Sequence, residues 1–201
     1  MRAGKENEPP MPEPLAYFLT WSTYGTWLPG DERGRIEYRH GWQLPDPVKK
    51  LEAAARMTED ACWLDCEQRD VVERQIAETC QVRGWALHAV NCRSNHVHVV
   101  LTADRAPKIV RNQLKAWCTR RLKELEIKRR QARDVPYLRF GLVSDANSST
   151  LTRSVSEEAG DLNIRENWWA ERGSQRFING AECLEAAILY VRDGQDKPRE
   201  H

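Results

Sequence analysis

The sequence predicts an α+β fold, in which an antiparallel sheet is covered by helices. The main observation is the order of the strand-like and helix-like patterns: strand, helix, two strands joined as a hairpin, helix, hairpin, helix. The second is a composition of 30% charged and 40% hydrophobic residues, which is typical of globular domains. The third is the length of 201 residues, which suits a single domain.

The first strand is expected in "LAYFLTWSTY", where Tyr17, Leu19 and Trp21 alternate with Phe18. Both faces of this segment are apolar, which is typical of a strand in the centre of a sheet. The stretch "PGDERG" predicts a turn, and "DPVKKLEAAARM" predicts a short helix after an irregular segment.

A longer helix is expected over about residues 65–83, because Val72, Ile76 and Cys80 recur at helical spacing. Gly84 ends this helix in the usual C-terminal role of glycine. The segments "WALHAVN" and "HVHVVLTA" then predict a hairpin across "CRSN".

The next helix begins at Pro107, since proline is favoured at the first helical position. We expect Val110, Leu114, Trp117 and Leu125 to point inward from it. Later in the chain, "WWAERGSQRFIN" predicts a hairpin and "AECLEAAILYVRD" predicts a last helix.

The expected organisation is a loose tail over residues 1–14, which is polar and proline-rich, followed by one domain over residues 15–197. The pattern is lost at about residues 128–166, so we expect a loop insertion there. This insertion is expected to be a surface loop. The alternative is an added DNA-contact loop, because the segment starts with "KRRQAR".

No apolar run approaches the ~20 residues needed to span a bilayer, so we expect no membrane partner. The first residues lack the hydrophobic core of a secretion signal, so a cytoplasmic protein is expected. The six cysteines are then expected to be reduced thiols packed as small hydrophobes. Cys62 and Cys66 form a C-x3-C pair, but no second close pair follows, which argues against a zinc site.

A strongly basic segment interrupts a chain whose net charge is only +1. Residues 105–133 hold eleven Lys or Arg and two acids, and the other residues hold 20 basic and 28 acidic side chains. This asymmetry suggests a polyanion partner, most simply nucleic acid. The alternative is a solvated helix face.

Two of the five histidines, His96 and His98, lie two residues apart in the β-branched run "NHVHVVLT". Side chains at i and i+2 of a strand share one face, so Val97 and Val99 point the other way. Two imidazoles on one face can form half of a metal site, and the alternative is two polar residues on a solvated face. A catalytic divalent ion needs a third protein ligand. The end of the chain offers three candidates: Asp193, Gln195 and Asp196.

The last helix also carries Tyr190, which can act as a nucleophile towards a metal-bound phosphate. A free tyrosine has a pKa of about 10, so a base or a metal must assist it at neutral pH. The alternative is structural, because Tyr190 borders the apolar stripe of Leu184, Ile188 and Val191, where a half-buried tyrosine fits equally well.

Taken together, these segments resemble a known family. "NHVHVVL" resembles the His-hydrophobic-His motif of HUH endonucleases, with Asn95 in the usual preceding position. With the opening "FLTWSTYGTWLPGDERG" and the closing "AAILYVRDGQD", it resembles the single-tyrosine transposases, and among them the REP-associated, insertion-sequence-200-like proteins of bacteria. The resemblance covers about residues 15–127 and 167–197, with three separated motifs in the family's order.

The resemblance implies a ferredoxin-like or RRM-like sheet with the histidines on its central strands. It implies that His96, His98 and Gln195 bind Mg²⁺ or Mn²⁺, and that Tyr190 attacks a phosphodiester of single-stranded or hairpin DNA. The products implied are a covalent 5'-phosphotyrosine and a free 3'-hydroxyl, and a second attack rejoins strands. The activity implied is therefore that of a DNA transposase.

Gln195 departs from the family pattern, in which the glutamine lies four residues after the tyrosine. At five residues after Tyr190 on a continuous helix, it would lie about 140° away around the axis. The site then requires that the helix end near Asp193 and that Gly194 adopt a left-handed turn, which swings Gln195 back. Asp193 is the competing third ligand.

With this resemblance the basic helix acquires a role, because its cations can neutralise DNA phosphates without choosing a sequence. The candidate residues are Lys108, Arg111, Lys115, Arg120 and Arg121. Trp21, Tyr24 and Trp27 beside a turn can stack on unpaired bases. The alternative for these three aromatic residues is a place in the core.

Three interpretations of the function follow. The first is the tyrosine-dependent DNA enzyme, and the second is a nucleic-acid-binding module that descends from such a transposase and performs no chemistry. The third is a metal-dependent phosphodiesterase that uses water, with Tyr190 structural. The sequence leaves open whether the protein is a monomer or a homodimer, which DNA it recognises, and whether it moves its own element or acts on genomic repeats.

Overall fold

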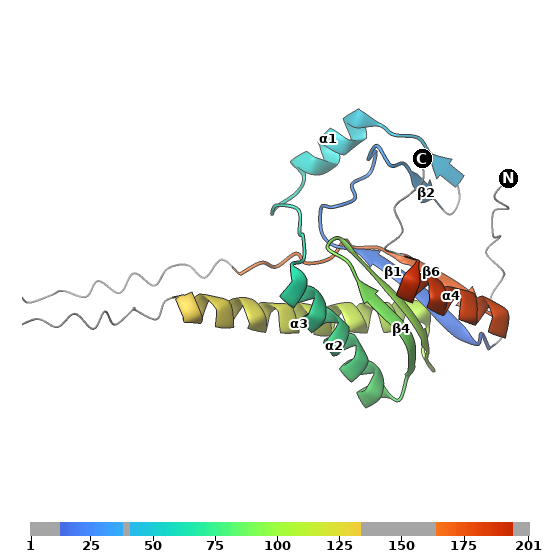
Figure 1. Ribbon diagram of the computed structural model, residues 1–201. Helices are drawn as coiled ribbons and strands as arrows, with labels where there is room; N and C mark the ends of the chain where they lie inside the picture. Colours follow the sequence, from blue (N-terminus) through green and yellow to red (C-terminus); the bar gives the residue numbers. More distant parts are fainter. Residues whose placement is uncertain (1–12, 38–40, 134–163, 195–201) are drawn as a thin grey trace, which may run out of the picture.

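The computed structural model describes residues 13–37, 41–133 and 164–194 (Figure 1). The strands are β1 (Ala16–Ser22), β2 (Arg35–Glu37), β3 (Gly41–Gln43), β4 (Ala86–Cys92), β5 (His96–Thr102) and β6 (Ser174–Ile178). The helices are α1 (Pro47–Ala55), α2 (Cys66–Arg83), α3 (Pro107–Arg133) and α4 (Ala181–Asp193).

The main sheet has four strands in the order β4-β5-β1-β6, and every neighbouring pair is antiparallel. The α+β class with an antiparallel sheet is therefore confirmed. The strand β1 lies between β5 and β6, which confirms its predicted central position. A separate two-stranded sheet of β2 and β3 belongs, with α1, to a small lobe inserted between β1 and α2.

The two faces of the sheet carry different helices (Figure 1). Alternate side chains of the central strands, such as Leu19, Trp21, Val97 and Val99, join α2 and α3 in the larger core. The opposite face packs against α4 through a smaller core, whose buried members are Ala16, Ala89, Val100, Ile178 and Val191. Any chemistry carried by the other alternate residues of β5 must therefore occur on the α4 face.

The helix α2 follows the sequence prediction closely. Asp65 accepts a hydrogen bond from the Gln68 amide, and the Gln68 side chain accepts one from the Asp65 amide, which completes a capping box. At the other end Gly84 has φ 70°, the left-handed conformation that glycine adopts without a steric penalty. Val72, Ile76 and Cys80 are buried, as their spacing predicted.

Other predictions about the elements were wrong. The segment "WWAERGSQRFIN" is not a hairpin, because it contains only β6 and a single bridge from Trp169 to Thr23. Trp117 is exposed, and Cys118 and Leu122 take the inward positions on α3. This helix continues to Arg133, so the first six residues of the expected insertion are helical. The rest of that insertion up to residue 163, and residues 1–12 of the expected tail, lie outside the described residues.

All six cysteines are free thiols, and four of them are buried as the sequence predicted: Cys62, Cys80, Cys92 and Cys118. Cys66 and Cys183 are exposed, so the prediction of packed thiols was wrong for these two. Burial raises the pKa of the Cys62 thiol to about 11, which suits an inert packing residue. Among the described residues, no helix combines the length and the apolar composition that crossing a membrane requires.

Candidate active site

Three aromatic side chains from two distant segments of the chain meet on the α4 face of the sheet. The ring centroids of His96 and His98 are 4.7 Å apart, and the ring of Tyr190 lies 5.8 Å from that of His98. Phe18 of β1 completes the group, at 5.5 Å from His98 and 6.0 Å from Tyr190. The structure therefore brings together the two histidines and the tyrosine that the sequence analysis selected.

The alternation of β5 places the histidines here. Val97 and Val99 are fully buried in the larger core, so His96 and His98 must face α4. The register sets His98 opposite Thr20 of β1 and His96 opposite Ser22. On α4, the buried Val191 anchors the helix to the sheet, and the neighbouring Tyr190 keeps 48% of its surface exposed. The phenol is thus held against His98 yet accessible to a large substrate.

Each histidine is oriented through its Nδ1 atom. The Nδ1 of His96 lies 2.6 Å from the Oδ1 of Asn95, and the Nδ1 of His98 lies 2.8 Å from the Oγ1 of Thr20. Because an amide oxygen only accepts hydrogen bonds, the Nδ1 of His96 is the donor, and the lone pair of a neutral ring is on Nε2. The Thr20 hydroxyl can either donate or accept, so it is compatible with a Nδ1–H tautomer of His98 as well.

The start of β5 is fixed by a tight cluster of hydrogen bonds at the carbonyl of Asn95. This oxygen accepts from the Thr23 amide at 2.9 Å, from the Thr23 hydroxyl at 3.1 Å and from the Thr26 hydroxyl at 3.3 Å. Thr23 is fully buried and Thr26 nearly so. The turn after β1 therefore holds the backbone immediately before His96 in one position.

The protonation of His98 is set by its surroundings. Burial lowers the pKa of His98 to about 3, and the positive charges of His96 and Arg93 add to the effect. Only 8% of the residue is exposed. The ring is neutral at neutral pH, which is the state that metal ligation requires.

This pKa shift predicts a pH dependence of stability. An unfolded histidine has a pKa of about 6.5, so below that pH the unfolded chain gains a proton at His98 that the folded chain does not. The free energy of unfolding should therefore decrease as the pH is lowered from about 6.5 to about 3, by up to ~1.4 kcal/mol per pH unit. Above a pH of about 6.5 this contribution to stability should be constant. Urea unfolding of the chelator-treated protein at neutral and mildly acidic pH measures it.

The control for that prediction is His98→Asn, which removes the titrating group and keeps a polar side chain next to Thr20. The variant should lose less stability than the wild-type protein over the same pH interval. An equal loss in both proteins would show that His98 is not the group responsible.

The described residues do not supply the third metal ligand that the sequence analysis expected. Within residues 13–37, 41–133 and 164–194, no three His, Cys, Asp or Glu side chains gather as a metal site would need. Asp193 is thus not brought together with the two histidines. Gln195 and Asp196 lie outside the described residues. Gly194 has φ −79° and ψ −10°, a right-handed helical conformation, so the expected left-handed turn is wrong.

The basic helix α3 lies on the other face of the sheet from the histidines. Two of its predicted DNA contacts are interior. Arg111 is 7% exposed and donates to the carbonyl of Gly173 at 2.7 Å. Lys115 is 8% exposed and donates to the carbonyls of Ala170 at 2.7 Å and Arg172 at 3.0 Å. These two cations hold the segment before β6, and they do not have the exposed placement that phosphate binding requires.

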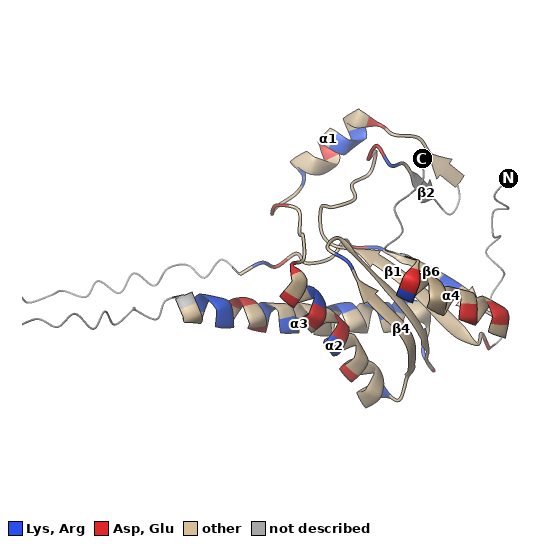
Figure 2. Ribbon diagram, in the orientation of Figure 1, with Lys and Arg blue, Asp and Glu red and all other residues tan. Residues whose placement is uncertain are grey.

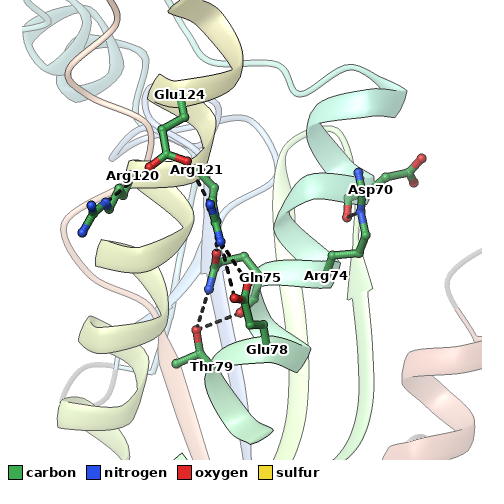
Figure 3. Close-up of polar contacts among 8 residues, drawn as sticks. All are labelled: Asp70, Arg74, Gln75, Glu78, Thr79, Arg120, Arg121 and Glu124. Atoms are coloured by element: carbon green, nitrogen blue, oxygen red, sulfur yellow. Dashed lines mark hydrogen bonds and ion pairs between the residues drawn. The ribbon is translucent and has the colours of Figure 1, made fainter. Parts of the chain in front are cut away.

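Acidic partners occupy two more cations of α3 (Figure 3). Arg121 donates to Gln75 of α2 at 2.6 Å and forms ion pairs with Glu78 and Glu124. Arg120 pairs with Glu124 at 3.3 Å. Lys108 is exposed at the start of the helix. Figure 2 shows that charges of both signs lie close together along the whole helix pair, since acidic segments of α2 lie beside the basic segments of α3.

The aromatic residues predicted to stack on bases differ in their exposure to solvent. Trp21 is 1% exposed in the larger core, so it cannot stack on a base. Tyr24 is partly buried, and its hydroxyl accepts a hydrogen bond from the Thr58 amide. Trp27 is 45% exposed, with the guanidinium of Arg33 over its ring at 4.7 Å. Of the three, only Trp27 offers substantial ring surface to solvent.

Two residues of the site were missed by the sequence analysis. Phe18 contacts the rings of His98 and Tyr190, Thr20 contacts His98, and both residues lie on the partly exposed face of β1. The alternation of β1 already separated them from Tyr17, Leu19 and Trp21. What the sequence lacked was the pairing of β1 with β5, which puts Thr20 directly opposite His98.

Comparison of the chain with models of known protein families finds no match, and comparison with curated proteins finds none either.

Proposed function

We propose that this protein is a metal-dependent enzyme that nicks single-stranded DNA and transfers the strand through a covalent bond to Tyr190. The observation that supports it most is the convergence of Tyr190, His96 and His98 on one face of the sheet. The resemblance to single-tyrosine transposases and HUH endonucleases selected these residues without the structure. The spatial strand order and the β-α-β-β-α-β sequence of the main elements also suit the ferredoxin-like sheet that the resemblance implies.

In the proposed reaction the phenolic oxygen of Tyr190 forms a bond to the phosphorus of the scissile phosphodiester, and the phenol proton passes to solvent. The bond between phosphorus and the 3'-oxygen breaks, and that oxygen takes up a proton. The products are a 5'-phosphotyrosine and a free 3'-hydroxyl. Attack of a 3'-hydroxyl on the phosphotyrosine reverses these steps and joins strands, so no external energy source is needed.

The residues of the site suit Mg²⁺ or Mn²⁺. The hydrogen bond from His96 to Asn95 directs the lone pair of its neutral ring to Nε2, and burial keeps His98 neutral. His96 and His98 would hold the ion. Gln195 lies outside the described residues, and Gly194 lacks the left-handed turn by which Gln195 was expected to reach the site, so the third ligand is not assigned. When bound, the ion supplies Lewis-acid polarisation of the phosphate. Tyr190 has the exposure that lets a DNA strand reach its hydroxyl.

The contact between Thr20 and His98 predicts a change in metal affinity. Thr20→Val keeps the shape of the side chain and removes the hydroxyl that orients Nδ1 of His98. We expect Mn²⁺ to bind roughly 10- to 100-fold more weakly, the usual cost of losing such an orienting partner. Isothermal titration with Mn²⁺ measures this in the absence of DNA. Thr20→Ser is the matched control, because it restores the hydroxyl, and its affinity should stay close to that of the wild type.

The proposed function is tested by incubating the protein with labelled single-stranded DNA hairpins, taken from repeats that flank the gene, and Mn²⁺. A denaturing gel should show a protein–DNA adduct. Mass spectrometry of the digested adduct should place the nucleotide on Tyr190. The protein band should carry the label only when the label is on the DNA fragment whose 5'-phosphate is bound to Tyr190. Cleavage without an adduct would favour the water-using phosphodiesterase.

The second candidate is a nucleic-acid-binding module that performs no chemistry. The observation in its favour is that, in the described part of the chain, no third His, Cys, Asp or Glu joins the two histidines. Binding of the same hairpins with neither adduct nor cleavage would support it over the enzyme.

A further inference from the structure

The α4 face of the sheet is covered unevenly. The helix packs on β4 and β5. On β1, Phe18, Thr20 and Ser22 are each partly exposed on this face. On β6, the next strand, Ser174 and Arg176 are exposed. The histidines and Tyr190 therefore border a strip of open sheet surface, formed by β1 and β6, which we call the β1–β6 strip.

The register defines where Arg176 lies in this strip. It pairs with Phe18 across β1 and β6, and Phe18 contacts both His98 and Tyr190. Two residues along the strand, Ile178 is buried in the small core against α4, so Arg176 must be on the same face. Side chains opposite one another in an antiparallel pair have Cβ atoms about 4.5–5.5 Å apart. Arg176 therefore lies one strand away from the ring that touches both parts of the site.

Arg176 also differs in its partners from three arginines of α3. Within the described residues it forms no ion pair, whereas Arg120, Arg121 and Arg129 are all paired with acids. An arginine presents a planar fork of donors that fits two phosphate oxygens. Thr20, Ser22 and Ser174 add hydroxyl groups along the strip, which suit a sugar–phosphate backbone.

We propose that the β1–β6 strip is the surface on which single-stranded DNA lies, and that Arg176 binds a phosphate of the strand beside the scissile one. This inference rests on the proposed function, and it names the path of the substrate, which the sequence analysis had placed on α3. A strand bound along α3 would lie on the wrong face of the sheet. A strand on the β1–β6 strip passes directly alongside His98 and Tyr190.

The test measures binding without chemistry, in a Tyr190→Phe background with Mn²⁺ and a labelled single-stranded oligothymidine. Fluorescence anisotropy gives Kd over salt concentrations from about 50 to about 200 mM, a range in which lost phosphate contacts are visible. Arg176→Gln should weaken binding about tenfold, the value of one charge-assisted hydrogen bond. It should also reduce the slope of log Kd against log salt by about 0.7, as expected for one contact to a single strand.

Two further variants make the result specific. Arg176→Lys keeps the charge and should retain most of the slope. Lys108→Gln removes one exposed charge from α3, on the opposite face, and should leave the slope unchanged. If Arg176→Gln and Lys108→Gln reduce the slope equally, only the net charge matters, and the inference is overturned. A slope change confined to Lys108→Gln would move the DNA to α3 and overturn it as well.

The outcome is separable from that of the proposed function. If the wild-type protein forms the Tyr190 adduct but Arg176→Gln keeps its full salt dependence, the enzyme stands and the DNA path is wrong. If no adduct forms but Arg176→Gln loses the contact, the strip binds DNA and the enzymatic proposal fails.

Discussion

Replacing Tyr190 with phenylalanine is expected to abolish covalent capture of DNA. The ring contacts with Phe18 and His98 do not involve the hydroxyl, so the variant should keep its fold and its place on the sheet. Removing the nucleophile of an enzyme lowers turnover by about 10⁴-fold or more, and we expect a decrease of that order in the rate of adduct formation. The rate is measured on labelled hairpin DNA with Mn²⁺, by quantifying the adduct band over time.

The matched control for this experiment is Tyr24→Phe. It also removes one phenolic oxygen, but from a tyrosine of the neighbouring turn, where the hydroxyl accepts a hydrogen bond from the Thr58 amide. This variant should form the adduct at a rate near that of the wild type. Adduct formation by Tyr190→Phe at the wild-type rate would mean that another residue is the nucleophile.

Replacing Trp21 with alanine is expected to have the largest effect on stability. Trp21 is among the largest fully buried side chains, and it packs in the core that joins β1 to α2 and α3. Truncation of a buried tryptophan costs about 3–5 kcal/mol, because apolar contacts are lost and a cavity remains. We expect the free energy of unfolding, measured by urea denaturation, to fall by that amount.

Trp27→Ala is the comparison. Trp27 is 45% exposed, and its main partners are the guanidinium of Arg33 and the carbonyl of Gly34. Losing these contacts should cost roughly 1 kcal/mol. Equal losses in the two variants would contradict the burial of Trp21, and weaker DNA binding by a folded Trp21→Ala protein would revive the stacking interpretation.

Much of the fold could be predicted because local signals agree with the tertiary structure. Asp65 and Gly84 mark the ends of α2 by capping chemistry that acts within a few residues. The period of two in β5 separated His96 and His98 from Val97 and Val99 before any partner strand was known. The shared face of the two histidines could therefore be predicted, because it depends only on the alternation of one strand.

The errors arise where a side chain's role depends on a distant partner. A count of charges along α3 cannot show that Lys115 binds the carbonyls of residues 170–172, or that Arg121 is paired with Glu78 of α2. Nor can helical spacing show which of Trp117 and Cys118 faces the core, because both spacings from the buried Leu114, three and four residues, are compatible with one helix face. Arg176 was overlooked for the same reason, since only the pairing of β6 with β1 brings it close to Phe18.

The alternation of β5 also links the candidate site to the correct folding of the chain. A slip of one residue in the pairing of β5 would turn His96 and His98 into the larger core and expose Val97 and Val99 to solvent. Burying two imidazoles in place of two valines costs several kcal/mol, which is a large part of the stability of a typical domain. A molecule with misplaced histidines is therefore largely unfolded. Molecules that fold but carry misplaced histidines should be rare, so the fraction of a preparation that forms the candidate site should follow its folded fraction.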